Sequence, residues 1–208
     1  MFGHLRNILS IMKRGFTVRR LTNMEDNSNS RIVWMDMEMT GLDIEKDQIM
    51  EVACMVTDSN LNIVAEGPNI ILHTSEDVLC NMSEWCIKQH KKTGLTDLSQ
   101  KSNVTIEDAE KELFTFISSH TLERCCPLAG NSVYMDRLFL RKFMPKVNGY
   151  LHYRIIDVST IKELCRMWNK DIYKSNPQKS FEHRALGDIK ESIAELQFYK
   201  NNFFNVKF

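Results

Sequence analysis

Three consecutive segments near the start of the chain are strand-like runs, and in the first of them apolar and polar positions alternate toward the end. The segments cover residues 31–39, 48–57 and 62–73. Side chains on a strand point alternately to its two faces, so a strand with one buried face shows a period of two. A polar Asp-Ser-Asn cluster at 58–60 separates the last two segments and is typical of a tight turn. The pattern therefore predicts an antiparallel meander of three strands.

From residue 76 onward, the spacing of apolar residues lengthens to the period of helices. Thr105 and Asp108 have the spacing of a capping box, which predicts a helix over 105–120. Ser159 is expected to cap another helix. The remaining predicted elements are short strands at 125–129 and 154–158 and helices at 132–143, 160–168 and 184–200. A meander followed by alternating helices and strands predicts an α/β fold built on a mixed sheet.

The first predicted strand ends in two carboxylates. Ile32, Trp34, Asp36 and Glu38 share one face of this strand, while the other face is apolar. Two like charges about 7 Å apart repel each other and are costly to desolvate unless a cation neutralises them. Hard carboxylate oxygens at this spacing suit Mg²⁺ or Mn²⁺. The alternative is an edge strand that leaves both acids in water.

Three further residues, whose side chains can bind a metal ion or accept a proton, lie at the ends of predicted elements. Asp136 falls in the first turns of a helix, where an acid also complements the helix dipole without any other role. His183 and Asp188 lie at the start of the last helix, and His183 alone is equally explained as a cap or a packed residue. Together with the strand pair, these residues make four acids and one histidine at element ends, which favours a shared site.

The stretch from Arg31 to Phe203 resembles the oligoribonuclease family, which are DEDDh-type 3′-to-5′ exonucleases with an RNase H-like fold. The motifs that carry the resemblance are DMEMTGLD, IMEVACMVTDSNLNIVAEGP, GNSVYMDRLFL, HYRIIDVST and HRALGDIKESIAEL. The resemblance implies two divalent cations, Mg²⁺ or Mn²⁺, held by Asp36, Glu38, Asp136 and Asp188. It also implies that His183 is the general base and that the protein is a homodimer. One departure is Gly187, where the family usually carries a second Asp.

The same resemblance implies how a short RNA is held. Leu42 matches a wedge between the two terminal bases, and Trp85 matches an aromatic ring on which the 5′ base stacks. The positions that match a cap on the 5′ phosphate are His90, Ser132, Tyr153 and Arg154, the last two reaching across the dimer. Without the family context, Leu42 suggests core packing, Trp85 a partly buried helix residue and Arg154 a solvated salt bridge. The implied substrates are di- to pentanucleotides, with dinucleotides preferred.

The net charge of zero hides an uneven distribution. Residues 1–24 hold five basic residues and no acid, so the rest of the chain is mildly acidic. This agrees with a short substrate, because enzymes that track long nucleic acids usually present a basic groove. The expected function is a 3′-to-5′ exoribonuclease that releases nucleoside 5′-monophosphates. The alternatives are an exonuclease of the same fold acting on longer RNA or DNA, and a non-catalytic nucleic-acid-binding protein.

The arginine-rich, acid-free start resembles a mitochondrial presequence, the alternative being a basic tail that binds nucleic acid. Met24 offers a second start, which would produce a cytoplasmic form. We therefore expect an extension with a polar linker over residues 1–30 and an exonuclease domain over 31–208. No apolar run is long enough for a membrane span. The six cysteines lack the spacing of a zinc site and are expected as reduced thiols rather than disulfides.

A presequence predicts where the first 30 residues send a cargo protein. A fluorescent reporter fused to residues 1–30 should concentrate in mitochondria, because a basic, acid-free segment with interspersed apolar residues is what the import machinery recognises. The measurement is co-localisation with a mitochondrial dye in living cells. A diffuse signal would contradict the presequence.

Overall fold

The computed structural model describes residues 30–177 and 184–204, and its helices and strands follow the predicted order. The elements are β1 (Ile32–Met39), β2 (Ile49–Thr57), β3 (Ile63–Ile71), α2 (Glu76–Cys80), α3 (Glu84–Lys92), α4 (Leu95–Lys101), α5 (Ile106–His120), β4 (Leu128–Gly130), α6 (Tyr134–Phe143), α7 (Pro145–Tyr150), β5 (Ile155–Asp157), α8 (Val158–Trp168), α9 (Lys170–Lys174) and α10 (Ala185–Asn202). Among the described residues, no helix is long and apolar enough to cross a bilayer.

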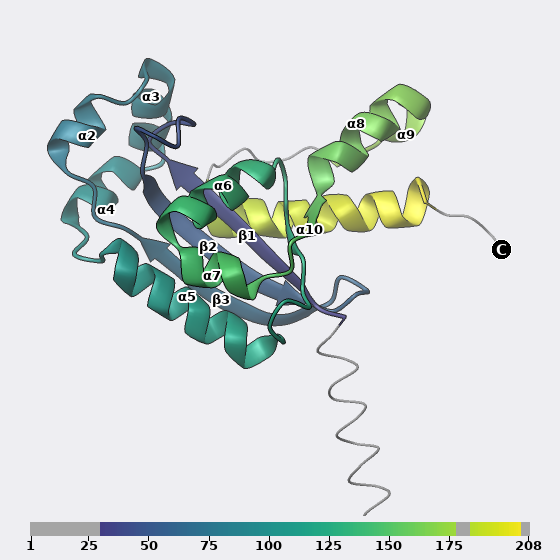
Figure 1. The fold of residues 1–208 in the computed structure, drawn as a ribbon. Coiled ribbons are helices and arrows are strands. Elements are labelled where there is room, and N and C mark those ends of the chain that lie inside the picture. The colour runs from purple at the N-terminus through teal and green to yellow at the C-terminus, as the bar shows by residue number, and fades with distance from the viewer. Residues whose placement is uncertain (1–29, 178–183, 205–208) are drawn as a thin grey trace, which may run out of the picture.

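The five strands form one mixed sheet in the order β3-β2-β1-β4-β5 (Figure 1). β1, β2 and β3 pair antiparallel, whereas β4 and β5 run parallel to β1. The side chain of Asp58 closes the β2–β3 turn by accepting hydrogen bonds from the backbone amides of Asn60 and Asn62. The predicted meander and mixed sheet are therefore confirmed.

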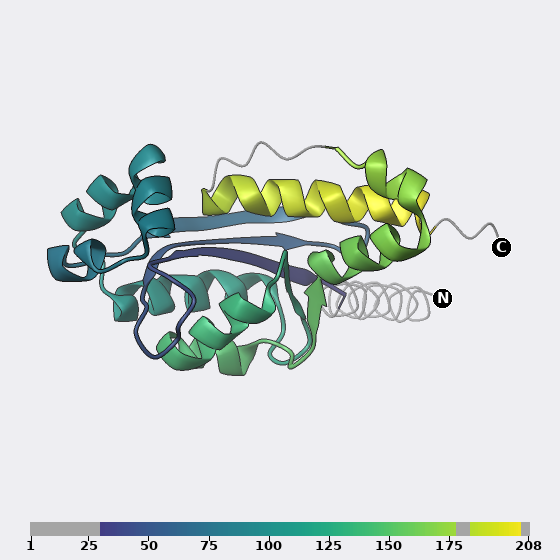
Figure 2. The same ribbon diagram turned by 90° about the horizontal axis from the view of Figure 1, so that it is seen from above.

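Helices cover both faces of the sheet, so the central strand β1 is buried on both sides (Figure 2). Val33, Met35 and Met37 point into a core built with α5, α6 and α7. Ile32 and Trp34 point into a second core built with α8 and α10. The predicted alternation along β1 is confirmed, and the edge-strand alternative is wrong because β1 lies between β2 and β4. Asp36 and Glu38 therefore belong to the face that α10 covers.

Two local features differ from, or add to, the sequence prediction. Ser159 does not cap α8, because the helix begins at Val158 and the Asp157 carboxylate accepts the hydrogen bond from the Ser159 amide. Pro145 ends α6 as expected, yet it also begins α7, since a proline is well suited to the first position of a helix. The Thr105 capping box opens α5 as predicted.

All six cysteines lie in the described part of the chain, and all are free thiols, as expected. The short helices α2, α3 and α4 do not lie on a face of the sheet but gather at one end of it (Figure 2). This end is where β1 finishes, so these helices adjoin the carboxylate pair.

Gly187 lies in the first turn of α10, and a β-carbon added there meets nothing within 4 Å. Gly187→Ala should raise the free energy of unfolding by about 0.5–1 kcal/mol, because alanine loses less backbone entropy in a helix. Gly130→Ala is the contrast, since its β-carbon would lie 2.8 Å from the carbonyl oxygen of Met35 and should destabilise the protein. Urea unfolding measures both effects, and a loss of stability in Gly187→Ala would contradict the prediction.

Candidate active site

Three carboxylates from two elements converge at the end of the central strand. Asp36 and Glu38 extend from the same face of β1, and Asp188 comes from the first turns of α10, which crosses that face. One oxygen from each of the three lies within 4.8 Å of the others. The sequence-based grouping of these three residues agrees with this geometry.

The electrostatic environment of Glu38 shows how unfavourable this cluster is without a cation. Burial raises the pKa of Glu38 to about 8, and the charges of Asp188, Glu51 and Asp136 act in the same direction. The guanidinium of Arg184 lowers it. Carboxylate oxygens that converge and repel one another are the donor set that hard divalent cations bind, so the residues present fit such an ion.

Asp136 occupies a buried position in α6 close to the cluster. Burial raises the pKa of its carboxyl to about 8, although hydrogen bonds from its own amide and that of Met37 lower it. Its carboxylate is not among the three whose oxygens converge, but its charge acts on Glu38. Asp136 lies in the first turn of α6, where it complements the helix dipole, and its charge also acts on Glu38.

His183, the expected base, lies outside the described residues. A different histidine, His90 of α3, lies beside the acidic cluster. Its Nε2 donates a hydrogen bond to the carbonyl oxygen of Met39 at 2.9 Å, and its Nδ1 lies 3.9 Å from a carboxylate oxygen of Glu38. The imidazole is buried, although His90 also lines a groove beside the cluster.

A groove of about 1050 Å³ opens beside the cluster, lined by the end of β1, the loop that follows it, and α2 and α3. Glu38, Leu42 and Trp85 all line this groove. Leu42 is 66% exposed and Trp85 is 61% exposed, so core packing does not explain either residue. Asp47 braces the Leu42 loop, because its carboxylate accepts hydrogen bonds from the Thr40 hydroxyl at 2.9 Å and from the loop backbone.

Ser132 lies at the same edge of the sheet as the cluster, while Tyr153 and Arg154 do not. Ser132 follows β4, and its amide donates to Asp157 at the end of the parallel strand β5. Tyr153 and Arg154 precede β5, which places them at the opposite edge. Both are exposed, and the guanidinium lies over the Tyr153 ring at 5.2 Å from its centroid. A single chain therefore does not bring these two residues to Asp36.

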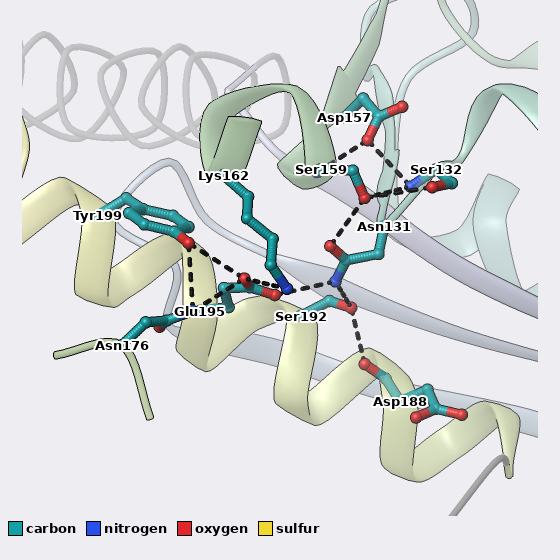
Figure 3. Close-up of polar contacts among 10 residues, drawn as sticks. All are labelled: Asn131, Ser132, Asp157, Ser159, Lys162, Asn176, Asp188, Ser192, Glu195 and Tyr199. Atoms are coloured by element: carbon teal, nitrogen blue, oxygen red, sulfur yellow. Dashed lines mark hydrogen bonds and ion pairs between the residues drawn. The ribbon is translucent and has the colours of Figure 1, made fainter. Parts of the chain in front are cut away.

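A chain of hydrogen bonds links the backbone of Asp188 to the loop after β4 (Figure 3). The Asn131 amide group donates to Ser192 at 2.7 Å and to Glu195 at 3.3 Å, and it accepts from Ser159 at 3.1 Å. The Ser192 hydroxyl then donates to the Asp188 carbonyl at 2.7 Å, while the Asp188 carboxylate points away from this network. Sequence reasoning missed these contacts, because they join residues on three separate elements.

The fold and the carboxylate cluster define a class, the 3′-to-5′ exonucleases with an RNase H-like fold. The family model described as "Exonuclease" matches residues 33–196. Two solved structures of exonuclease I, one of them from Methylocaldum szegediense, have TM-scores of 0.64 and 0.65 at 16% sequence identity. They match 84% and 83% of this chain, which spans only 41% of each of theirs, so they share its fold.

Relatives of higher sequence identity show to which family of exonucleases this chain belongs. The human mitochondrial oligoribonuclease is 56% identical over 177 residues, which are 85% of this chain and 75% of that protein. A probable oligoribonuclease of Drosophila melanogaster is 49% identical over 98% of this chain and 100% of its own length. The oligoribonuclease of Pseudoalteromonas atlantica is 49% identical over 84% of this chain and 96% of its own. This chain belongs to the oligoribonuclease family of exonucleases.

The metal-free protein should lose stability as the pH rises. The pKa of Glu38 is raised from 4.5 to about 8 in the folded protein, so protonation of Glu38 stabilises the fold fully below pH 4.5. That contribution disappears as the pH rises through 8. The free energy of unfolding, measured with urea in EDTA, should fall across this window.

Glu38→Gln is the control, because a neutral side chain at this position cannot titrate. The variant should show a smaller fall in stability over the same pH range. Mn²⁺ added at pH 8 should restore the stability of the wild type but much less that of the variant. Equal pH dependence in the two proteins would contradict the assignment of the raised pKa.

Proposed function

We propose that this protein hydrolyses very short RNA, above all dinucleotides, from the 3′ end and releases nucleoside 5′-monophosphates. The observation that carries the proposal is the position of the carboxylate cluster, which borders a groove lined by Leu42 and Trp85. A phosphodiester beside Glu38 would leave room for few bases in this groove. The names of the curated relatives support the same substrate class.

The four carboxylates are proposed to hold two divalent cations, Mg²⁺ or Mn²⁺: Asp36, Glu38, Asp136 and Asp188. When bound, such cations supply an activated water and stabilise the charge on the leaving 3′ oxygen. His183 is proposed to accept the proton of the attacking water, because an imidazole with a pKa near 6.5 takes up a proton at about neutral pH.

The groove residues are proposed to hold the two bases. Leu42 would separate the bases as a wedge, and Trp85 would stack on the 5′ base with about 1 to 3 kcal/mol, largely independent of base identity. Ser132 and His90 are proposed to contact the 5′ phosphate. Ser132 is an exposed residue after the end of β4, and its hydroxyl lies 3.2 Å from that of Ser159, which supports this role.

Tyr153 and Arg154 are proposed to complete the phosphate cap from a second copy of the chain. Their position at the edge of the sheet opposite Asp36 supports a homodimer, since one chain cannot place them in its own site. Both side chains are exposed, and the guanidinium fork suits a terminal phosphate. The protein is therefore proposed to act as a dimer in which the second chain contributes two residues to each site.

The location of the protein is proposed to be mitochondrial. The basic extension over residues 1–30 supports this, and so does the similarity to the human mitochondrial oligoribonuclease. Residues 31–208 would form the exonuclease domain. Translation from Met24 would omit all five basic residues of this extension and yield a cytoplasmic form.

The proposal is tested with a 5′-labelled RNA dinucleotide and an RNA 20-mer, each with Mn²⁺ or EDTA. The wild type should cleave the dinucleotide fast and only with metal, and the 20-mer slowly. Asp36→Ala should abolish turnover while leaving the unfolding transition intact, because it removes a converging carboxylate. A preference for the 20-mer would favour an exonuclease for longer substrates, and no cleavage of either would favour a silent binding protein.

The effect of substituting a residue of the proposed 5′-phosphate cap should depend on the length of the substrate. Arg154→Ala should reduce kcat/KM for the dinucleotide by at least tenfold and by less for a pentamer, because a longer chain has more contacts to replace the lost one. The measurement is steady-state kinetics on both lengths. An equal loss on both would argue against a cap on the 5′ phosphate.

A further inference from the structure

A fifth carboxylate lies beside the cluster, and no function considered so far uses it. Glu51 of β2 is fully buried and is the cross-strand partner of Glu38 in the antiparallel pair. Directly opposite residues share one face of a sheet, and like charges in such a pair destabilise it. The charge of Glu51 indeed raises the pKa of Glu38. Its burial next to other acids therefore requires a specific partner.

The partner is Arg184, whose planar guanidinium forms a bidentate ion pair with the Glu51 carboxylate. Nε lies 3.2 Å and 3.0 Å from the two carboxylate oxygens, and Nη2 lies 2.9 Å from Oε1. Charged hydrogen bonds of this kind fix orientation as well as charge. The Arg184 charge also lowers the pKa of Glu38, so it offsets part of the repulsion within the cluster.

Arg184 also determines where α10 begins. It is the residue immediately before the helix, in an extended backbone conformation, and its carbonyl accepts the hydrogen bond from the Asp188 amide at 3.0 Å. The side chain of Arg184 is thus anchored on β2 while its backbone carries the first turn that presents Asp188. The other side of Asp188 is held by Ser192, whose hydroxyl bonds to its carbonyl.

We propose that the Glu51–Arg184 pair is a positioning device that fixes Asp188 against Asp36 and Glu38, so that cation binding depends on it. This inference rests on the proposed metal-binding role of those three carboxylates. Neither Glu51 nor Arg184 is proposed to touch the cation. The fork geometry matters as well as the charge, because a lysine would neutralise Glu51 without fixing the start of the helix.

The test uses the full-length protein and measures three quantities: Mn²⁺ affinity by calorimetry, kcat and KM on the RNA dinucleotide, and the unfolding temperature in EDTA. Arg184→Gln should weaken Mn²⁺ binding by 10- to 100-fold, the range typical of residues that orient metal ligands. Arg184→Lys should weaken it at least fivefold. Both should lower kcat, while KM stays within twofold because the Leu42 groove is untouched.

Lys190→Gln is the matched control on the same helix. It removes a cation that pairs with Glu66 of β3 at 3.1 Å, yet both of these side chains are about half exposed. Its Mn²⁺ affinity and kcat should stay within twofold of the wild type. A loss equal to that of Arg184→Gln would overturn the inference, since any weakening of the contact between α10 and the sheet would then suffice.

Arg184→Gln leaves a buried charge unpaired and can fail to fold for that reason alone. The double variant Glu51→Gln with Arg184→Gln removes the charge and should unfold in EDTA within a few degrees of the wild type. Its Mn²⁺ affinity should remain at least tenfold weaker. Wild-type affinity in the double variant, or in Arg184→Lys, would show that the pair is only structural and overturn the inference.

The variant Asp188→Asn distinguishes failure of the positioning role from failure of the proposed metal-binding function. If the wild type binds no Mn²⁺, or if Asp188→Asn binds it as well as the wild type, the metal-binding role of the cluster is wrong. If Asp188→Asn loses binding while the Arg184 variants keep it, the cluster is confirmed and only the positioning role is wrong.

Discussion

The repulsion between carboxylates buried at the end of β1 is the constraint that organises this protein. Burial, together with the charges of Asp188, Glu51 and Asp136, raises the pKa of Glu38 to about 8. Such a cluster is costly to keep ionised unless a cation compensates the charge or a carboxyl stays protonated. A divalent cation supplies that charge in the proposed catalytic state, and Arg184 supplies part of it from within the chain. The clustered carboxylates therefore favour cation binding and lower the stability of the metal-free protein.

The mixed sheet brings the residues of the proposed site together. Because β1, β4 and β5 are parallel, their carboxyl ends place the acid pair, Ser132 and Asp157 at one edge. The antiparallel neighbour β2 brings Glu51 opposite Glu38 at the same place. α10 then lies across the face that carries both acids and adds Asp188. Beyond the end of the sheet, α2 and α3 line the groove that would hold the bases.

Local patterns in the sequence predicted the elements, because period-two alternation, capping boxes and turn residues act over a few neighbouring positions. The pair Asp36 and Glu38 was visible for this reason, since alternation alone puts both on one face. The contacts of Glu51 with Arg184 and of His90 with Glu38 were not visible. They join residues far apart in the chain, and a lone buried Glu or His carries no local signal. Ser159 was misassigned as a cap because Asp157 competes for the same role two residues earlier.

The most direct test of the central claim is an anomalous difference map from crystals grown with Mn²⁺ and a non-hydrolysable RNA dinucleotide. The account predicts manganese peaks within ligand distance of Asp36 and Asp188, with the dinucleotide phosphate beside them and its bases at Leu42 and Trp85. A bound dinucleotide with no peak at this cluster would contradict the claim that the buried carboxylates are gathered there to bind cations.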